Sequence, residues 1–293
     1  MSSLISRAKI NLCLHVVGKR PDGFHQLQSL VTFAQFGDEL SVVDYGRTGN
    51  GDKLQIQGEF ASQLANDETN LIMRALKAFR RQWPNALGFD ISLLLTKNLP
   101  IASGVGGGSA NAASLLKLVS EISSIEIDPR QLHKLALGIG SDMPVCLLEK
   151  PAMMAGRGEV IVPLENFPTL FAVLVNPGIA VSTGKVFASL GMTKNPALPD
   201  VGKSLETVDG LVSWLHRTRN DLEGEAIKMV PEIGQIIERF QGDVNCLFAR
   251  MCGSGATVFA LFDNMEKAEK GAVAIRRQWP QFWVQPTVLM GSA

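Results

Sequence analysis

Apolar and polar positions alternate along the first part of the chain in the way that β-strands require. Ile10, Leu12 and Leu14 occupy every second position, and the polar side chains of Lys9 and Asn11 fall on the opposite face of an extended chain. The same alternation, or a short apolar run, predicts further strands at residues 27–36, 39–44, 53–57 and 90–97.

Helical spacing of apolar positions first occurs between residues 70 and 83, and Pro84 ends that helix. A second helix is expected over residues 110–122, directly after a glycine-rich segment. A third has Pro129 in its first turn and ends at residues 138–140, where two glycines stand. The same spacing predicts later helices at residues 184–190, 205–216, 222–240 and 267–278.

Short strands complete the predicted elements, at residues 145–148, 152–155, 159–162, 171–175, 247–251, 257–262 and 282–288. Because strands and helices are mixed without a strict βαβ alternation, the predicted fold class is α+β. A length of 293 residues allows about two domains. We expect an N-terminal domain of residues 1–155 and a C-terminal domain of residues 156–293, although no linker composition marks the boundary.

The charge balance narrows the classes of function. Lys and Arg together number 28, as do Asp and Glu, so the net charge is zero. Proteins that bind nucleic acids carry a basic excess or stripe, so this balance argues against that class, including an RNA-binding module. It leaves room for a small anionic ligand, which needs only a local positive site. Apolar residues make up 46% of the chain, which is enough for a sizeable core.

The sequence gives no indication of secretion or of a membrane span. Its apolar runs are shorter than the ~18 residues that a transmembrane helix needs. The first nine residues lack a charged head followed by a long apolar stretch, so no signal peptide is expected. Cys13, Cys146, Cys246 and Cys252 have the spacing of neither a zinc site nor a disulfide framework. We therefore expect reduced, mostly buried thiols, no membrane partner and a cytoplasmic location.

The segment Gly104-Val105-Gly106-Gly107-Gly108-Ser109 is the first candidate for chemistry. Its glycines lack Cβ atoms, so backbone N–H groups can turn toward one point, and the following helix adds the positive end of its dipole. These features favour a phosphate site, with Ser109 capping the helix and reaching a phosphate or a metal-bound water. The alternative is a flexible turn between a strand and a helix. The segment lacks the Lys-Ser/Thr of a P-loop and does not fit the dinucleotide-binding fingerprint.

Two further segments carry weaker signals when each is taken alone. Gly253-Ser254-Gly255-Ala256 lies between two predicted strands and is typical of a tight turn. Gly140-Ser141-Asp142-Met143-Pro144 places one carboxylate just after a predicted helix, and is typical of a turn before proline. Their combination with the glycine segment and with the opening Ala8-Lys9-Ile10-Asn11-Leu12 changes the interpretation.

The combination resembles the small-molecule kinases of the GHMP superfamily. Residues 100–113, which begin at Pro100 and include Ala110, resemble the superfamily's second motif, and residues 251–259 resemble its third. Segments at residues 8–12, 18–30, 140–145, 176–178 and 220–223 make the chain similar to one family within it, the 4-diphosphocytidyl-2-C-methyl-D-erythritol kinases. The resemblance extends from about residue 7 to residue 263.

The resemblance implies a two-domain GHMP kinase fold, with a ribosomal protein S5 domain 2-like N-terminal half and a ferredoxin-like C-terminal half. The implied reaction transfers the γ-phosphoryl group of ATP to the 2-hydroxyl of a cytidine-diphosphate-linked methylerythritol, in the non-mevalonate route to isopentenyl diphosphate. Asp142 corresponds to the catalytic aspartate, which would accept the hydroxyl proton. Lys9 corresponds to its partner, which would keep Asp142 ionised and stabilise charge on the transferred group. Asn11, on the same strand face as Lys9, would orient the acceptor.

The resemblance also implies a nucleotide site. The glycine segment 104–109 would wrap the phosphates of ATP. Asn70, Leu71 and Lys97 match positions that line the adenine pocket, although Asn70 also suits a helix N-cap and Leu71 a core position. Magnesium is expected to arrive with ATP, held chiefly by phosphates and water, and Ser109 is the candidate protein ligand.

Cytosine is expected to bind between aromatic rings, because every base offers a flat face for stacking. Phe187 matches one stacking position. Phe24 stands where many relatives have Tyr, so the ring is kept and the phenol hydroxyl is lost. His25 would read the edge of cytosine. The remaining histidines, His15, His133 and His216, match no such position and are interpreted as structural.

The chain departs from the family pattern at two positions, and two other functions were considered. Ala110 and Cys252 stand where relatives often have small hydroxyl residues, which affects nucleotide affinity rather than catalysis. Another GHMP kinase, such as homoserine kinase, is disfavoured because a small amino-acid alcohol needs no base-stacking pair like Phe24 and Phe187. A nucleotide-binding homologue without catalysis is disfavoured because both Lys9 and Asp142 are present.

Overall fold

The computed structural model describes residues 2–46, 49, 51–191 and 195–292. Contacts divide the chain into two compact units. The first unit contains the chain up to Ala8, Phe36–Ile101 and Gly106–Glu149; the second contains Lys9–Gln35, Ala102–Val105 and the chain from Lys150 onward. Both units are discontinuous because the long strands β1 (Ser3–Lys19) and β2 (His25–Gly46) contribute residues to each. The two continuous domains, 1–155 and 156–293, stay a prediction.

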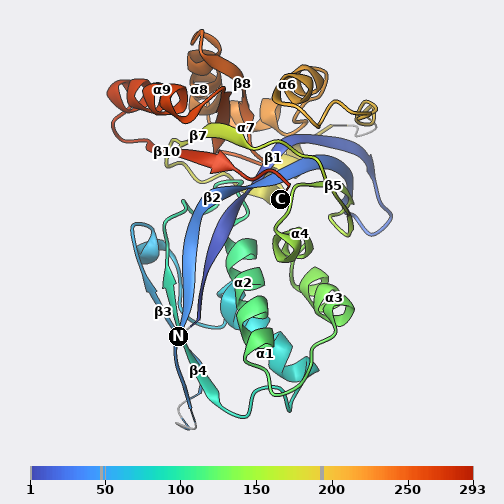
Figure 1. Ribbon diagram of the computed structural model, residues 1–293, viewed down its shortest axis with the longest axis vertical. Coiled ribbons are helices and arrows are strands. Elements are labelled where there is room, and N and C mark those ends of the chain that lie inside the picture. Colours follow the sequence, from blue (N-terminus) through green and yellow to red (C-terminus); the bar gives the residue numbers. More distant parts are fainter. Residues whose placement is uncertain (1, 47–48, 50, 192–194, 293) are drawn as a thin grey trace. The chain divides into compact units, whose positions relative to one another are not determined.

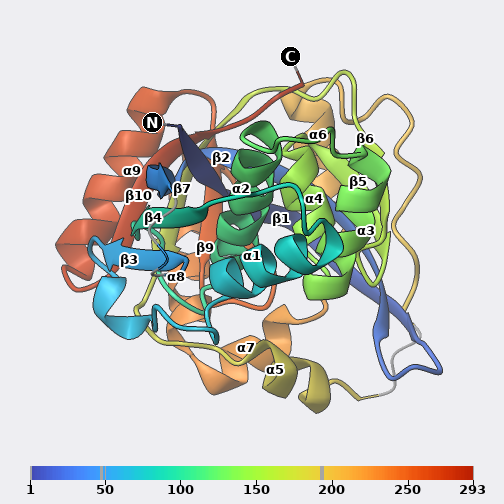
Figure 2. The same cartoon turned by 90° about the horizontal axis from the view of Figure 1, so that it is seen from below.

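In its described residues, the first unit packs four helices with a small sheet. The C-terminal part of β2 pairs antiparallel with β4 (Asp90–Thr96), and β3 (Lys53–Gln57) pairs parallel with β4. Figures 1 and 2 show the helices gathered on one side of β3 and β4. They are α1 (Leu71–Gln82), α2 (Gly107–Glu121), α3 (Pro129–Ile139) and α4 (Met143–Leu148), and a 3-10 turn, η1 (Ala61–Gln63), follows β3.

The alternation of β4 explains how this unit forms its core. Ile91, Leu93 and Leu95 are buried, and the residues between them are half-buried, as a period of two predicts. On α1, Leu76 and Phe79 are one turn apart and are buried in the same cluster as the β4 side chains. Apolar side chains at every second residue of β4 therefore pack in one cluster with apolar side chains one turn apart on α1.

The second unit is built on an antiparallel sheet whose strands follow the order β10 (Trp283–Leu289), β7 (Leu170–Asn176), β9 (Val258–Phe262) and β8 (Cys246–Met251). The N-terminal part of β2 pairs with β5 (Ala152–Gly156), which pairs with β6 (Val160–Pro163). β10 meets β2 where Leu289 lies opposite Ala34. Strands and helices are thus mixed in both units, and the predicted α+β class is confirmed.

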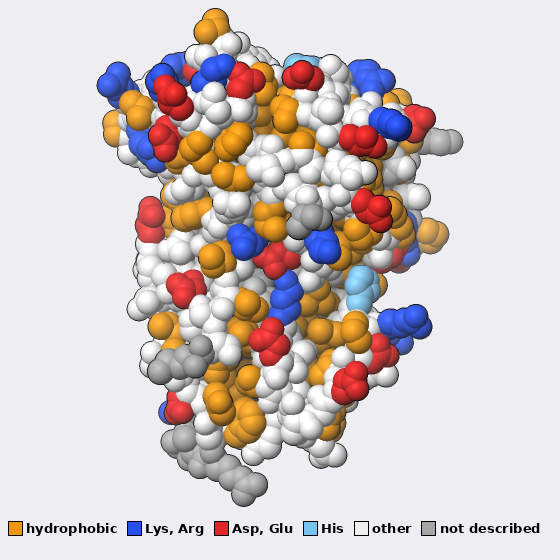
Figure 3. Space-filling view, viewed as in Figure 1, with side chains coloured by type: hydrophobic (Ala, Val, Ile, Leu, Met, Phe, Trp, Pro, Cys, Tyr) orange, Lys and Arg blue, Asp and Glu red, His pale blue; other side chains and the backbone are white. Residues whose placement is uncertain are grey.

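Helices α8 (Glu232–Gln241) and α9 (Met265–Gln278) pack against this sheet, on one side of it in Figure 1. The described part of this unit also has three shorter helices: α5 (Thr183–Ser189), α6 (Val208–His216) and α7 (Glu223–Met229). Figure 3 shows basic and acidic side chains interspersed over α9, where the exposed Lys270 and Glu266 pair at 2.6 Å. Exposed ion pairs of this kind contribute little to the stability of the fold. Helix α9 is therefore stabilised mainly by its buried face, which includes Ala268, Ala272 and Ile275.

One predicted element is wrong. Residues 145–148, expected as a strand, form most of α4. A run of four apolar residues has no periodicity that distinguishes a strand from a helix. Pro144, in the first turn of α4, has a fixed φ that suits a helix start, and this signal decides the local structure.

Two other predictions have the right type and wrong boundaries. The helix predicted over residues 222–240 is divided into α7 and α8, because Pro231 lacks the N–H that would continue α7. The strands predicted at 27–36 and 39–44 are one strand, β2. Gly37 lies between them, and a Cβ atom there would be 2.2 Å from the carbonyl oxygen of Ser6, so the glycine allows β1 to approach closely.

Two helical glycines of the second unit should respond to alanine with opposite signs. A Cβ atom on Gly271 in α9 would lie 2.7 Å from the Phe262 ring, whereas one on Gly224 in α7 would meet nothing within 4 Å. Gly271→Ala should lower the free energy of unfolding by about 1–3 kcal/mol through overpacking. Gly224→Ala should raise it by up to about 1 kcal/mol through helix propensity. Urea unfolding of both variants checks this, and equal signs would contradict the packing at Phe262.

Candidate active site

Helix α2 begins within the glycine segment, earlier than predicted. The helix starts at Gly107 rather than at residue 110, and its N-cap is Gly106, which has a φ of 66°. The prediction that Ser109 caps the helix is therefore wrong: no side chain caps it, because the left-handed turn at Gly106 places Ser109 inside the first turn. The first intrahelical bond runs from the N–H of Ala110 to the oxygen of Gly106, at 2.9 Å.

The N-terminus of α2 has the chemistry of an anion site. The N–H groups of Gly107, Gly108 and Ser109 precede the first intrahelical bond, so they have no carbonyl partner within the helix. The first turn of α2 contains no acidic residue that would compete with an anion. The helix dipole adds positive potential at the same place.

In the second unit, the beginning of the glycine segment is packed against the third glycine-rich turn. A Cβ atom on Gly104 would lie 2.5 Å from the carbonyl oxygen of Cys252, and one on Gly253 would lie 2.6 Å from that of Gly104. Both glycines have positive φ, of 78° and 54°. Only glycine satisfies both the backbone angle and the space, so the two turns predicted separately form one contact.

Strand β1 carries two predicted site residues into the second unit, and both are buried. Lys9 is 3% exposed, and its N–H donates to the oxygen of Val105 at 2.9 Å. Asn11 is 1% exposed, and its Nδ2 donates to Ser29 Oγ at 2.8 Å. Asn11 Oδ1 has no hydrogen-bond partner among the described residues. A buried acceptor without a donor is unfavourable by about 1–3 kcal/mol, so Asn11 is suited to a donor supplied by a ligand.

Asp142 lies in the first unit, at the residue that precedes α4. It is half-buried and makes no capping hydrogen bond to the helix. The neighbouring Gly140 is close to the first turn of α2, since a Cβ atom there would lie 4.0 Å from Ser109 Oγ. The segment that contains Asp142 therefore passes close to the first turn of α2. Lys9 belongs to the second unit, and its pairing with Asp142 stays a prediction.

Three residues predicted to line the adenine pocket have structural contacts in the first unit. Asn70 is the N-cap of α1: its Oδ1 accepts from the N–H of Ile72 at 3.0 Å. Leu71 packs against the core cluster. Lys97 is 3% exposed, and its Nζ donates to Asp38 at 2.7 Å and to the oxygen of Leu99 at 2.6 Å. Burial lowers the pKa of Lys97, and the Asp38 carboxylate opposes that shift. The lining of adenine by these residues stays a prediction.

The aromatic residues predicted to bind cytosine lie in the second unit. The His25 and Phe187 rings are stacked, with centroids 4.9 Å apart and planes at 24°. Burial, aided by the charge of Lys19, holds the pKa of His25 below its usual range, so the ring is neutral near pH 7 and offers both a donor and an acceptor. Phe24 is 48% exposed, and the Arg157 guanidinium lies 5.2 Å from its ring centroid.

The loop that carries Phe24 is held by ionic and backbone contacts. The N–H of Arg20 donates to the oxygen of Phe24 at 2.7 Å, which closes the turn. The Arg20 guanidinium also pairs with Glu159 at 2.8 Å, beyond the end of β5. Phe24 is therefore an exposed ring on a loop that is fixed at its base.

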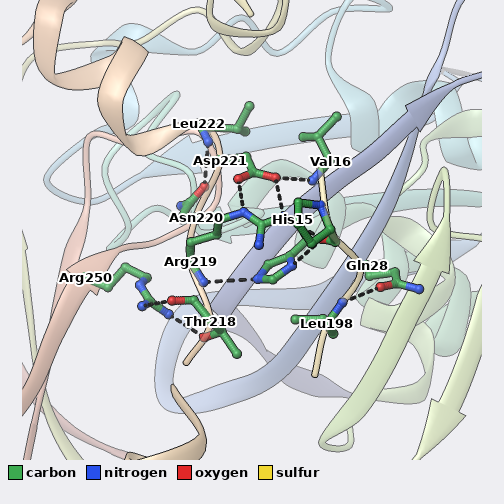
Figure 4. Close-up of polar contacts among 11 residues, drawn as sticks. His15, Val16, Gln28, Leu198, Thr218, Arg219, Asn220, Asp221, Leu222 and Arg250 are labelled. Atoms are coloured by element: carbon green, nitrogen blue, oxygen red, sulfur yellow. Dashed lines mark hydrogen bonds and ion pairs between the residues drawn. The ribbon is translucent and has the colours of Figure 1, made fainter. Parts of the chain in front are cut away.

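Sequence reasoning assigned no role to the segment Thr218–Leu222, which Figure 4 shows beside β1. The N–H of Arg219 donates to His15 Nε2 at 3.1 Å, so Nδ1 of the neutral ring donates to the oxygen of Pro196 at 3.2 Å. Burial lowers the pKa of His15, with a further lowering from the charge of Arg219. His15 is fully buried and bonded to backbone groups, which fits its predicted structural role.

A buried arginine completes this polar region. The Arg250 guanidinium donates to the oxygen of Leu12 at 3.2 Å, to Thr218 Oγ1 at 2.9 Å and to the oxygen of Thr218 at 2.7 Å. The sequence signal for this region was a charged residue within the predicted strand 247–251, together with the Asn-Asp pair before a helix. Neither signal identifies the partner, which comes from elsewhere in the chain.

Several general expectations can be compared with the described residues. Three of the four cysteines are buried and Cys246 is half-buried, so the predicted burial is confirmed. Burial raises the pKa of Cys13 and of Cys246 to about 11, so both stay protonated. Across the described residues, no group of three His, Cys, Asp or Glu side chains is arranged to hold a metal ion. None of the described helices combines the length and apolar character needed to cross a bilayer.

Comparison with known proteins defines the class of protein first. Residues 70–150 match the GHMP kinases N terminal domain, and residues 196–281 match the GHMP kinases C terminal domain. A crystal structure of homoserine kinase from Cytophaga hutchinsonii superimposes with a TM-score of 0.68 at 18% identity, covering 99% of this chain and 96% of that one. This likeness shows a shared fold. The two matched domains place the chain in the class of GHMP kinases.

Sequence relatives then define the family. A 4-diphosphocytidyl-2-C-methyl-D-erythritol kinase of Chelativorans sp. is 40% identical over 97% of this chain and 94% of its own length. One of Methylorubrum extorquens is 42% identical over 99% of this chain and 100% of its own length. A crystal structure of 4-(cytidine 5'-diphospho)-2C-methyl-D-erythritol kinase matches with a TM-score of 0.78 and 29% identity, covering 99% of this chain and 100% of that one. The chain belongs to the family of 4-diphosphocytidyl-2-C-methyl-D-erythritol kinases.

The Lys97–Asp38 pair should contribute to stability independently of any ligand. Lys97→Met leaves the Asp38 carboxylate buried without its cation, so we expect a loss of about 3–5 kcal/mol in the free energy of unfolding. The matched control is Lys77→Met, because Lys77 pairs with Glu68 on the surface and should lose less than about 1 kcal/mol. Urea unfolding of both variants without nucleotide is the measurement. A Lys97→Met variant as stable as the control would contradict a structural role for this pair.

Proposed function

We propose that the chain transfers the γ-phosphoryl group of ATP to the 2-hydroxyl of 4-(cytidine 5'-diphospho)-2-C-methyl-D-erythritol, giving the 2-phosphate and ADP. The observation that carries this proposal is about 40% identity, over nearly the full length, to relatives named for that kinase activity. The product is a precursor of isopentenyl diphosphate in the methylerythritol phosphate route. The expected place of the reaction is the cytoplasm.

Phosphoryl transfer needs alignment, neutralisation of charge and a destination for the hydroxyl proton. We assign Asp142 as the acceptor of that proton. Lys9 stabilises the charge that develops on the transferred group. Asn11 orients the acceptor alcohol: its buried Oδ1, which has no partner among the described residues, accepts a hydrogen bond from another donor of the substrate, because the one proton of the reacting hydroxyl goes to Asp142.

The phosphates of ATP bind at the glycine segment. Support comes from the first-turn N–H groups of α2 and from the left-handed Gly106, which leaves the helix N-terminus uncapped by any side chain. Magnesium neutralises phosphate charge and is held chiefly by phosphates and water, with Ser109 as the candidate protein ligand. At the adenine, Asn70 and Leu71 offer surface at the start of α1. The Lys97 ammonium donates to Asp38 and to the Leu99 carbonyl, and the residue is 3% exposed, so we assign it a place behind the surface that adenine contacts.

Cytosine stacks on Phe24 and Phe187, and His25 reads its edge. Phe24 supports this assignment because almost half of its surface is exposed on a fixed loop. Phe187 and His25 support it because their rings already lie together in the second unit. A neutral His25 can donate to an acceptor on the base or accept from its exocyclic amine. A small amino-acid alcohol would use none of these rings, which disfavours homoserine as the substrate.

The direct test is a coupled assay of ADP release. The chain, ATP-Mg and the cytidine-linked methylerythritol should give ADP in proportion to substrate, and homoserine or mevalonate in its place should give only the background rate. Turnover of homoserine instead would establish the alternative kinase. A thermal shift with cytidine nucleotides and no turnover would establish a nucleotide-binding protein without catalysis.

Asp142→Asn should remove most turnover and leave ATP binding nearly unchanged, because the carboxylate acts in the transition state. The expected loss in kcat is about 10²–10⁴-fold, typical of a general base. Lys9→Ala should lose a similar amount, and the double variant should fall less than the product of both effects, since coupled residues are not additive. Steady-state kinetics and ATP titration are the measurements. Retention of more than about half the activity in Asp142→Asn would remove the assignment.

Phe24→Ala and Phe187→Ala should each raise the KM for the cytidine substrate by about ten- to hundredfold, which corresponds to ~1–3 kcal/mol of stacking. The KM for ATP should hardly change. Phe24→Tyr, which keeps the ring, is the matched control and should be nearly neutral.

The melting temperatures separate stacking from packing. Phe24 is half-exposed, so Phe24→Ala should melt near the wild type, whereas Phe187 also packs against the core of the second unit and its loss lowers stability. A lower melting temperature in either variant, with no selective effect on the cytidine substrate, would leave the cytosine site unassigned.

A further inference from the structure

The segment Thr218–Leu222 adds a short strand-like piece to the edge of β1. The N–H of Leu14 donates to the oxygen of Arg219 at 3.0 Å, and the N–H of Asp221 donates to the oxygen of Leu14 at 2.9 Å. Figure 4 shows the next contact along β1, in which the N–H of Val16 donates to Asp221 Oδ2 at 2.6 Å. The segment therefore satisfies consecutive backbone groups of the strand that carries Lys9 and Asn11.

The side chain of Asn220 faces a different part of the second unit. Its Nδ2 donates to the oxygen of Met251 at 2.9 Å and to the oxygen of Gly253 at 2.8 Å. Its Oδ1 accepts from the N–H of Leu222 at 3.0 Å. Two carbonyl partners require the NH₂ group, so the orientation of the amide is determined by its neighbours. Asn220 is 6% exposed, and its hydrogen bonds are made within the protein.

The turn that Asn220 holds is in contact with two groups of the proposed reaction site. The Cβ position of Gly253 is 2.6 Å from the oxygen of Gly104 and 3.2 Å from Asn11 Oδ1. The N–H of Asn11 also donates to Cys252 Sγ at 3.2 Å. A shift of the turn would therefore disturb both the start of the glycine segment and the side chain of Asn11.

We propose that Asn220 is a positioning residue for the phosphoryl transfer. It joins the edge of β1 to the turn Cys252–Gly255, so that Asn11 and Gly104 keep the spacing that the reaction needs. The inference rests on the proposed function, because its kinetic effect is measured in that reaction. Asn220 touches no substrate in this role, and its effect is transmitted through the carbonyls of Met251 and Gly253.

The first test is Asn220→Ala, compared with a variant of matched stability. Ile275, buried in α9, supplies the control: of Ile275→Val and Ile275→Ala, the one whose melting temperature is closer to that of Asn220→Ala is used. Well below both melting temperatures, Asn220→Ala should have a kcat about 100-fold lower than the control, because misplacement of about 1 Å has effects of that size. A kcat within about threefold of the control would overturn the proposal.

Hydrogen exchange provides a readout that does not depend on activity. Backbone amides of residues 251–257 should exchange faster in Asn220→Ala than in the Ile275 control. Equal exchange in the two variants would also overturn the proposal. If the wild-type chain releases no ADP with the cytidine substrate, the proposed function fails, and this comparison still tests the contact between Asn220 and the turn.

Asn220→Asp keeps the proposal testable if the alanine variant does not fold. The carboxylate has the shape of the amide, but it directs an oxygen at the two carbonyls instead of a donor. Burial raises the pKa of such a carboxyl, and its protonated form can donate once. The ratio of variant to wild-type kcat should therefore rise as the pH falls from about 8 to about 5.5. Both proteins are assayed well below their melting temperatures at each pH, because the ionised buried carboxylate also lowers stability at high pH and a loss of folded protein would give the same rise. A ratio that then stays constant across this range would overturn the proposal.

Discussion

Two backbone segments of the second unit meet where neither has room for a side chain. A Cβ atom on Gly104 would lie 2.5 Å from the oxygen of Cys252, and one on Gly253 would lie 2.6 Å from the oxygen of Gly104. These distances are far below any real Cβ contact, and both glycines also have positive φ. The start of the glycine segment, the turn after β8 and the Asn11 side chain are therefore placed relative to one another by a contact that only glycine permits.

Buried polar side chains of neighbouring segments stabilise this contact through hydrogen bonds. Asn220 donates to the carbonyls of Met251 and Gly253, Asp221 accepts from the backbone of β1, and Arg250 donates to the carbonyls of Leu12 and Thr218. Loss of the partner of any one of these buried groups would be unfavourable by about 1–3 kcal/mol, so separation of the segments would lower the stability of the second unit. A region with no assigned chemistry thus supports the residues that the proposed reaction uses.

Other groups are suited to contacts with a ligand. Asn11 Oδ1 is a buried acceptor with no partner among the described residues, and the first N–H groups of α2 have no carbonyl within the helix. Phe24 exposes almost half of its ring on a loop whose base is fixed by Arg20. Under the proposed function, the acceptor of Asn11 and the ring of Phe24 serve the alcohol substrate, and the N–H groups of α2 serve the phosphates of ATP.

The sequence alone determined the elements whose signals are local. The period of β4, the helix α1 with Asn70 as its cap, and Pro129 at the start of α3 depend on neighbours a few residues away. The glycine segment and the Gly23-Phe24-His25 segment also indicate the family, because the resemblance to it lies in runs of consecutive residues. Local signals failed at residues 145–148, where a short apolar run suits a strand and a helix equally, and at Ser109, where a left-handed glycine took the cap position. Only the tertiary structure decided that Lys97 is buried beside Asp38 and that Asn220 holds the turn at Gly253, since those partners lie 59 and 33 residues away along the chain. A hydrogen bond across such a separation depends on the packing that brings both groups out of water, and no pattern of neighbouring residues encodes it.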